Sequence, residues 1–384
     1  MINLVNVRST FLTDEMVMPP LGLLYLKAAL TRRGIDSKFI DLSNGDELPT
    51  NGQFYISATT PQIEEAKKLS KKGYTVIGGP HASVDPHSLI DYFDCVVVGE
   101  GEDVIPKIAI HKLRGIVYAD RIRELDKLPF PDRDPVSDYK YFINGQRATT
   151  MVTSRGCTGK CSFCCKAVMN KGIFFRSAEN VVEELTLIKN HYGYEAVMFY
   201  DDSLAMKKGR LIEICKGLKQ LKMTWRCFAR SDQVDYELLA MMADSGCYEI
   251  LFGIESGSNQ ILKNIRKHET REQHINAVIL SKIAGIRVKA LMIVGLPGET
   301  PETIQESKSF IQAAEPDDLD VTVLSVYKGC DIYNNPDRYE LTFSDPTWYK
   351  GKPGEYPCSV ETPAMKSDEI VEAREMLWKT FNAL

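Results

Sequence analysis

The chain has 384 residues, of which 44% are hydrophobic, and a formal net charge of −5. This length can form two domains, each with its own core, and the charge balance gives no overall basic field of the kind that nucleic-acid-binding domains carry. The N-terminus lacks the charged and apolar segments of a signal peptide, and no apolar run approaches the ~20 residues that a membrane span requires. We therefore expect a cytoplasmic protein with neither a membrane nor a nucleic acid as its partner.

Short β-branched segments alternate with amphipathic ones over residues 1–124. Strands are expected at Ile2–Val7, Lys38–Leu42, Gln53–Ser57, Thr75–Ile77 and Cys95–Val98, and helices at Pro20–Arg33 and Ile63–Lys72. This alternation predicts an α/β domain with a parallel, doubly wound, Rossmann-like sheet. Ligands of such sheets bind at the carboxyl ends of the strands, where Thr59, Thr60 and the loop Gly78–Ser83 would lie.

Residues 125–145 form a proline-rich linker, because proline continues neither a helix nor a central strand. The alternation then restarts, with strands expected at Thr149–Ser154, Ala196–Tyr200, Thr224–Ala229, Glu249–Ile254, Val288–Val294 and Val321–Val326. Helices fit at Glu179–Asn190, Lys208–Leu221, Tyr236–Ser245, Arg271–Ala284 and Pro301–Ala314. A full (β/α)8 barrel needs about 250 residues, so residues 146–330 predict a partial (β/α)6 barrel. Residues 331–384 form a C-terminal extension with a closing helix.

Three cysteines, Cys157, Cys161 and Cys164, follow the first barrel strand with the spacing C-x3-C-x2-C. Three thiolates at this spacing can bind three irons of a [4Fe–4S] cluster, which usually has four cysteine ligands. The fourth iron is then open to a molecule from outside the chain. A zinc site would need a fourth Cys or His nearby; Cys165 is adjacent, but its side chain need not point the same way. The cysteines could also be ordinary small buried residues, whereas a disulfide framework does not suit a chain of this size without a secretion signal.

Polar residues follow the next predicted strands, at the mouth where the working residues of βα barrels lie. Asp201 and Asp202 follow the second strand, where adjacent carboxylates are costly to bury unless they are hydrogen-bonded or paired with a cation. Arg230 follows the third strand and could bind a carboxylate through two hydrogen bonds. Glu255 follows the fourth strand and is flanked by glycines that permit close backbone approach.

The turn Gly295-Leu-Pro-Gly-Glu299 follows the fifth strand and could pack on an adenine ring. Each position also has an ordinary alternative: a helix cap at Asp202 or Ser203, a surface salt bridge at Arg230, or a structural turn at residues 295–299. Their succession, each at a predicted strand end, favours one shared site.

With Phe163 directly before the third cysteine, the cysteine motif resembles that of the radical S-adenosylmethionine (SAM) enzymes. The run of strand ends is similar to that family's order of elements over residues 146–330. The resemblance implies that SAM binds the open iron and is cleaved, after one-electron reduction, to a 5′-deoxyadenosyl radical. It also implies that SAM is held by Phe163, Asp201, Asp202, Arg230, Glu255, Ser256, Gly295 and Pro297, and that a flavodoxin or ferredoxin supplies the electron.

The N-terminal half resembles the cobalamin-binding branch of these enzymes. The similar segments are Pro19-Pro-Leu-Gly-Leu-Leu-Tyr25, Gly78-Gly-Pro-His81, Val98-Gly-Glu-Gly-Glu102 and Leu128-Pro-Phe-Pro131. The resemblance implies a cobalamin site that includes Thr59, Thr60, Gly78, Gly79 and His81. The chain departs from many cobalamin domains in lacking the run D-x-H-x-x-G, so no protein imidazole is expected on cobalt. The short, turn-rich stretch at residues 43–52 indicates a trimmed domain.

The expected function is therefore a cobalamin-dependent radical SAM methyltransferase that acts on an unactivated carbon of a small molecule or peptide. Two alternatives remain open from the sequence. One is a radical SAM enzyme without cobalamin that performs rearrangement, cyclisation or C–S chemistry, and the other is a non-catalytic iron–sulfur sensor or scaffold. Near the C-terminus, Cys330 and Cys358 could donate hydrogen or bind a metal near the substrate, or be ordinary small residues.

Overall fold

The computed structural model describes residues 1–10, 12, 14–166, 172–344 and 356–384. The N-terminal domain is built on a six-stranded parallel sheet in the order β2-β1-β3-β4-β5-β6. Its strands are β1 Ile2–Asn6, β2 Ser37–Asp41, β3 Gln53–Ser57, β4 Tyr74–Gly78, β5 Cys95–Val98 and β6 Gly115–Tyr118. The strand order reverses between β1 and β3, which confirms the predicted doubly wound sheet and places its ligand crevice at the carboxyl ends of these strands.

Four helices cover the two faces of this sheet: α1 Leu21–Arg32, α2 Ile63–Lys67, α3 Pro80–Val84 and α4 Ile105–His111. The cores on the two faces are separate. One contains Leu23, Leu24, Ile105 and Ile108 from α1 and α4, and the other contains residues of α2 and α3. Helix α2 is shorter than the predicted Ile63–Lys72, and β6 is an edge strand that the sequence analysis missed.

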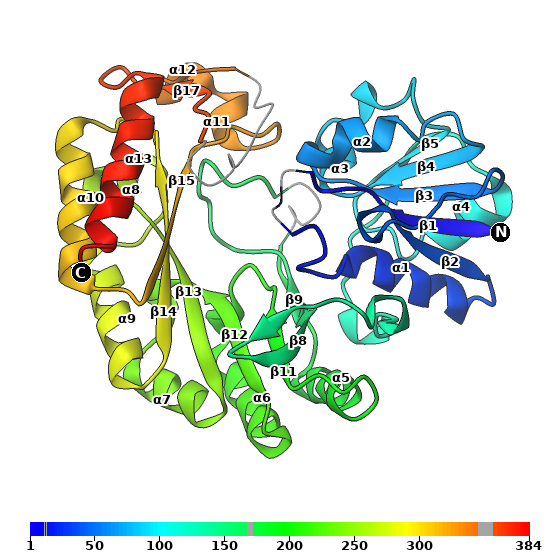
Figure 1. Cartoon of the computed structure of the whole chain (residues 1–384), viewed down its shortest axis with the longest axis horizontal. Coiled ribbons are helices and arrows are strands. Elements are labelled where there is room, and N and C mark those ends of the chain that lie inside the picture. The colour runs from blue at the N-terminus through cyan, green and yellow to red at the C-terminus, as the bar shows by residue number, and fades with distance from the viewer. Residues whose placement is uncertain (11, 13, 167–171, 345–355) are drawn as a thin grey trace.

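The second domain is a curled seven-stranded sheet in the order β15-β14-β13-β12-β11-β8-β7 (Figure 1). Its strands are β7 Phe142–Ile143, β8 Gln146–Met151, β11 Ala196–Phe199, β12 Thr224–Ala229, β13 Cys247–Glu255, β14 Arg287–Val294 and β15 Asp318–Val323. Only β7 is antiparallel to its neighbour. The six parallel strands confirm the predicted partial barrel, but β7 shows that the barrel sheet begins inside the predicted linker.

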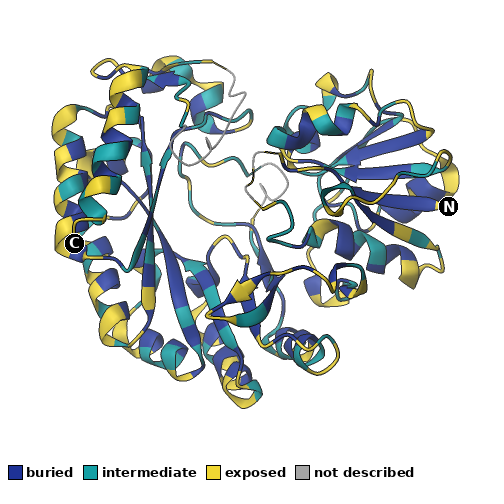
Figure 2. Cartoon of the chain, in the orientation of Figure 1, coloured by how far each residue is buried: buried dark blue, intermediate teal, exposed yellow. Residues whose placement is uncertain are grey.

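Helices pack on the outside of the barrel: α5 Ala178–Asn190, α6 Lys208–Leu221, α7 Tyr236–Asp244, α8 Asn259–Asn264, α9 Arg271–Ile283 and α10 Pro301–Ala314. The C-terminal extension adds α11 Asp331–Asn334, α12 Pro336–Tyr339 and α13 Ser367–Phe381, and a small ladder of β16 Thr342–Phe343 and β17 Val360–Glu361. Helix α13 packs on α10 and β15, where it covers the barrel's edge strand. Figure 2 shows that the strands of both domains are largely buried and that the outer helix surfaces are exposed.

The predicted linker is firmly attached to the barrel. The buried side chain of Arg133 donates to Glu184 of α5 at 2.6 Å and to the carbonyl oxygen of Thr150 at 3.0 Å. Arg176 pairs with the other oxygen of the same carboxylate. One buried anion is thus shared by two cations, which fixes the path of the chain between the domains. In the described parts of the chain, no helix is long and apolar enough to span a membrane.

Candidate functional site

The three cysteines of the motif lie on the loop between β9 (Ser154–Arg155) and β10 (Phe174–Phe175), which pair as a short antiparallel ladder and close the loop at its root. A Cβ atom at Gly159 would lie 3.3 Å from the sulfur of Cys157 and 3.8 Å from that of Cys161. Cys164 is exposed, but partial desolvation by the surrounding loop, and next the neighbouring Cys161 thiol, raise its pKa. The three thiols therefore form one interacting group.

Cationic side chains lie around these thiols. Burial raises the pKa of Cys161, and the nearby Lys267 and Arg230 oppose that rise. Lys166 acts in the same way on Cys164. Among the residues the structure describes, no three Cys, His, Asp or Glu side chains come close enough to hold a single metal ion. The carboxylates of Glu255 and Asp202 lie among these cations. Three thiols grouped on one loop fit an iron–sulfur cluster that keeps one iron open to a further ligand.

A buried ion pair lies at the end of β13. The Oε1 atom of Glu255 lies 2.9 Å from the Nζ atom of Lys267, and both side chains are buried. Glu255 has a φ of +63°, in the left-handed region that few non-glycine residues adopt. A Cβ atom at Gly253 would lie 2.6 Å from that Glu255 oxygen, so this glycine leaves room for the pair. The sequence analysis missed Lys267 because it follows helix α8 and not a strand.

Arg230, which follows β12 as predicted, extends this network. Its guanidinium donates two hydrogen bonds of 2.9 Å to Asp232. The buried carboxylate of Glu269 lies 3.3 Å from Arg230 and 3.4 Å from Lys267. Two cations and three carboxylates are therefore assembled beside Cys161. Such a set can hold the amino, carboxylate and hydroxyl groups of a zwitterionic ligand.

The two aspartates after β11 have different environments. Asp201 is buried and accepts hydrogen bonds from the backbone and hydroxyl of Thr153 and from Ser154, so it joins the ends of β8 and β11. Asp202 lines the cavity between the domains. Its side chain is exposed, but desolvation by the surrounding cavity wall raises its pKa, and Lys166 opposes this effect. Of the two aspartates, Asp202 lines the cavity and Asp201 does not.

The remaining predicted SAM residues lie at the ends of β13 and β14 or on the cysteine loop. Ser256 is fully buried with its hydroxyl 3.3 Å from that of Ser307 on α10. The backbone amide of Gly295 donates to Glu299, and the carbonyl of Pro297 accepts from Asn264 at 3.0 Å. These contacts organise the turn itself. Phe163 is half-buried and packs against the barrel core.

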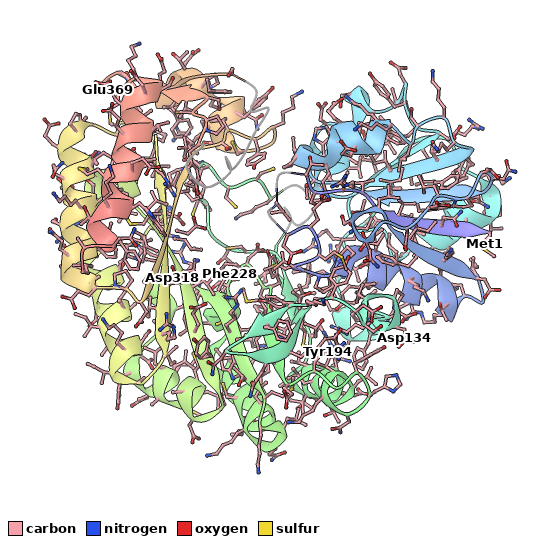
Figure 3. All side chains as sticks on the ribbon, in the orientation of Figure 1. Met1, Asp134, Tyr194, Phe228, Asp318 and Glu369 are labelled. Carbon is pink, nitrogen blue, oxygen red and sulfur yellow. The ribbon has the colours of Figure 1, made fainter. Side chains whose placement is uncertain are left out.

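A cavity of about 590 Å³ lies where the carboxyl edge of the N-terminal sheet meets the cysteine loop and the barrel mouth. The N-terminal domain contributes Met18, Tyr25, Ser57, Gly78, Gly79, Pro80 and Gly99 through Glu102, and the other domain contributes Thr150, Cys164, Lys166, Tyr200 and Asp202. Phe228 of β12, labelled in Figure 3, packs edge-to-face on Tyr200 with ring centroids 5.6 Å apart. The cavity thus reaches from Gly78 and Gly79 of the N-terminal domain to Cys164 and Asp202; Phe163, Asp201, Arg230, Glu255, Ser256, Gly295 and Pro297 lie outside its lining.

The predicted cobalamin residues divide into two groups. Gly78 and Gly79 line the cavity, whereas Thr59, Thr60 and His81 lie outside its lining. The ring of His81 lies 3.1 Å from the hydroxyl of Thr60, and burial lowers the pKa of this histidine. The side chain of Thr59 bonds to Gln62 at 2.9 Å. In this structure the three side chains contact one another or Gln62, and their place in a cobalamin site stays a prediction.

Cys330 and Cys358 also serve local structure. Cys330 is buried, and its sulfur accepts from the backbone amide of Tyr333 at 3.4 Å, capping α11. Cys358 donates to the carbonyl of Val360 at 3.2 Å. Neither lines the cavity, so the expectation that they act on a substrate there is not supported by their positions.

Comparison with known proteins places this geometry in a family. Residues 151–311 match the Radical SAM superfamily model. The chain is 30% identical to an uncharacterized methyltransferase of Pyrococcus horikoshii over 82% of this chain and 78% of that protein. It is 25% identical to the cytidylyl-2-hydroxyethylphosphonate methyltransferase of Streptomyces wedmorensis, over 77% of this chain and 73% of that protein.

Two solved structures share both domains. The radical SAM methyltransferase TsrM of Kitasatospora setae, determined with cobalamin and a [4Fe–4S] cluster, superposes with a TM-score of 0.75 at 15% identity, over 98% of this chain and 90% of that one. The cobalamin-dependent radical enzyme OxsB, with aqua-cobalamin and SAM bound, superposes with a TM-score of 0.69 at 19% identity, over 87% of this chain and 55% of that one. The chain therefore belongs to the radical SAM superfamily, and its two-domain fold is that of the superfamily's cobalamin-dependent members.

Proposed function

We propose that the protein is a cobalamin-dependent radical SAM methyltransferase that acts on an unactivated carbon of a small molecule or peptide. When bound, the cluster, SAM and cobalamin would supply an electron, a hydrogen-abstracting radical and a methyl group. The chain's own residues bind these groups, orient them and keep water out. The observation that carries this proposal is the single cavity that joins the carboxyl edge of the N-terminal sheet to Cys164 and Asp202.

The residues divide this work by position. Cys157, Cys161 and Cys164 hold the cluster. Arg230 and the ion pair of Lys267 with Glu255 lie beside Cys161 and can hold the polar groups of SAM. On the other side of the cavity, glycines at residues 78, 79 and 99 permit the backbone to approach a flat macrocycle. The apolar side chains of the lining, such as Met18 and Tyr25, exclude water from the space between the two sites.

The named relatives support methyl transfer in particular. They include methyltransferases for a phosphonate and for bacteriochlorophyllide d, a hopanoid methylase and a magnesium-protoporphyrin ester cyclase. The cyclase, together with the positions of Thr59, Thr60 and His81 away from the cavity, favours a second candidate: a radical SAM enzyme that does not transfer methyl from cobalamin. An acidic one-electron donor such as a flavodoxin or ferredoxin is proposed as the reducing partner of either enzyme.

Corrin binding separates the two candidates. Protein whose cluster has been reconstituted without oxygen is incubated with hydroxocobalamin, desalted, and examined by its visible spectrum. The proposed function predicts about one corrin per chain, and a protein that keeps its cluster but no corrin contradicts it. The variant Gly78→Leu tests the site itself: a Cβ atom at this position meets nothing nearer than 3.6 Å, so the backbone can accept a side chain there. It should fill the corrin site and abolish retention, whereas Gly209→Ala, on the exposed side of α6, should not.

A further inference from the structure

The segment Val98-Gly-Glu-Gly-Glu102 follows β5 and forms part of the cavity wall. Its two carboxylates are not solvated, since Glu100 is 3% exposed and Glu102 is 7% exposed. A buried carboxylate is stable only when cations or several hydrogen-bond donors compensate it. The partners of these two residues therefore indicate what the segment does.

Both carboxylates bind Arg155, the last residue before the cysteine loop. The Nη1 atom of Arg155 lies 2.7 Å from Glu100 and its Nη2 atom lies 2.6 Å from Glu102. Arg121 pairs with the second oxygen of Glu100 and donates to the carbonyl oxygen of Arg155 at 3.1 Å. Burial alone would lower the pKa of Arg155, but the two carboxylates outweigh it and raise that pKa. Two anions and two cations thus compensate one another inside the protein.

The glycines of the same segment bring the carboxylates to this position. Gly99 has a φ of +99°, and a Cβ atom there would lie 2.9 Å from the carbonyl oxygen of Ala119. A Cβ atom at Gly101 would lie 3.0 Å from the side chain of Leu26. The position of Gly99 therefore requires glycine for the loop to pack against its own domain, whereas a side chain at Gly101 would only displace Leu26 slightly. In this segment the glycines allow close packing, and the glutamates between and after them form the ion pairs with Arg155.

The arginine is held on its other face as well. The ring of Tyr25, on α1, lies with its centroid 5.1 Å from the guanidinium carbon of Arg155. Cation–π contacts of this kind are strongest where water is excluded. Arg155 also stands in the β9–β10 ladder, opposite Phe174. The root of the cysteine loop is therefore fixed to the N-terminal domain by two ion pairs and an aromatic contact.

We propose that Glu100, Glu102 and Arg155 are positioning residues that hold the cysteine loop in register with the carboxyl edge of the N-terminal sheet. This inference rests on the proposed function, because it assigns the network the task of setting the distance between cluster and corrin. The ion pairs of Glu100 and Glu102 end on Arg155, directly before the loop that carries the cluster ligands, so they constrain that loop as well as the contact between the domains. The ion pair of Lys328 with Asp85, at 2.7 Å, also joins the two domains. Lys328 meets the loop at Cys165, whose thiol donates to its carbonyl oxygen, and the pair includes no atom of Arg155.

The test compares the double variant Glu100→Gln/Glu102→Gln with Asp85→Asn, which removes the other interdomain pair. Hydrogen exchange of residues 156–161, next to Arg155, is measured first, on full-length protein without cofactors. The double variant should exchange about tenfold faster there than the wild type, with the barrel strands unchanged, and Asp85→Asn should not. Should the double variant fail to fold, Glu102→Gln alone, which leaves Arg155 paired with Glu100, is measured in the same way.

The second measurement uses protein loaded with cluster and cobalamin. Pulsed electron paramagnetic resonance reports the dipolar coupling between the reduced cluster and cob(II)alamin. The wild type should give one narrow distance distribution and the double variant a broad one, at equal cluster and corrin content. Unchanged exchange and an unchanged distribution would overturn the inference while leaving the proposed function intact. If the wild type retains no corrin, the proposed function fails, and the exchange measurement alone decides whether the network holds the loop.

Discussion

The Nζ atom of Lys267 lies 2.9 Å from the Oε1 atom of Glu255, and the two residues are 5% and 8% exposed. Burial by itself would lower the pKa of Lys267, but Glu255 and Glu269 raise it, so the lysine stays charged. The pair lies beside Cys161. A charged, water-poor pair at this point can exchange one partner for the charged groups of a bound ligand.

Removing the cation of this pair should destabilise the protein. Lys267→Met keeps the volume but leaves Glu255 and Glu269 with less compensation, so we expect the free energy of unfolding to fall by about 3 kcal/mol. Lys263→Met, at an exposed position on α8, should change it by less than about 0.5 kcal/mol. Urea denaturation gives the free energy of unfolding of both variants. Equal values for Lys267→Met and Lys263→Met would show that the ion pair does not stabilise the fold.

A second prediction concerns the attachment of the linker. Glu184→Gln leaves the buried side chains of Arg133 and Arg176 without their shared anion. The loss should be about 3–5 kcal/mol, and trypsin should then cleave the linker within residues 125–145. The neighbouring exposed position offers the control, Glu183→Gln, which should behave as the wild type. A Glu184→Gln protein that resists trypsin as well as the control does would contradict this role of the ion triad.

The turn after β14 should make stability depend on pH. Complete burial raises the pKa of Glu299 to about 8, although the amides of Gly295 and Leu296 oppose this shift. Between pH about 4.5 and 8 the folded carboxyl stays protonated while the unfolded one ionises, so stability falls as pH rises, by up to about 1.4 kcal/mol per unit. Glu299→Gln should remove this slope. Thermal unfolding at several pH values gives the free energy of unfolding of both proteins. If that free energy depended on pH equally in the wild type and in Glu299→Gln, the effect would be excluded.

The cysteine motif gives a fourth prediction with an internal control. Alanine at Cys157, Cys161 or Cys164 removes one of three ligands, and each variant should lose nearly all bound iron after anaerobic reconstitution. Cys165→Ala should retain about four irons per chain, because this thiol donates to the carbonyl of Lys328. Iron analysis and the visible absorbance report the outcome. Iron loss in the Cys165 variant equal to that in the others would require a different ligand set.

The fold could be predicted from the sequence wherever apolar periodicity was strong. The strand Val288–Val294 and the helix Lys208–Leu221 lie within a residue of β14 and α6. The last barrel strand was placed three residues late, at Val321–Val326 instead of Asp318–Val323. In that strand Asp318, Asp320 and Thr322 alternate with buried apolar residues. Because two of the first three residues are acidic, the sequence analysis did not assign the first half to a strand.

The candidate site could be predicted only in part. Strand ends located Arg230, Asp202 and Glu255, because parallel strands bring their carboxyl ends to one edge. The partners came from elsewhere: Lys267, which pairs with Glu255, follows a helix, and Glu100, which pairs with Arg155 before the cysteine loop, belongs to the other domain. Sequence spacing carries no information on such tertiary contacts. For the same reason it could not show that the carboxylate of Asp201 is saturated by Thr153 and Ser154.

The most direct test of the account is reductive cleavage of SAM. Protein with a reconstituted cluster is incubated without oxygen with SAM and dithionite, and 5′-deoxyadenosine is quantified by mass spectrometry. We expect the wild type to form this product and Cys161→Ala to form none. Failure of the cluster-loaded wild type to form any 5′-deoxyadenosine would contradict radical SAM chemistry and favour a sensor or scaffold, and formation by Cys161→Ala would refute the assignment of the cluster to these cysteines.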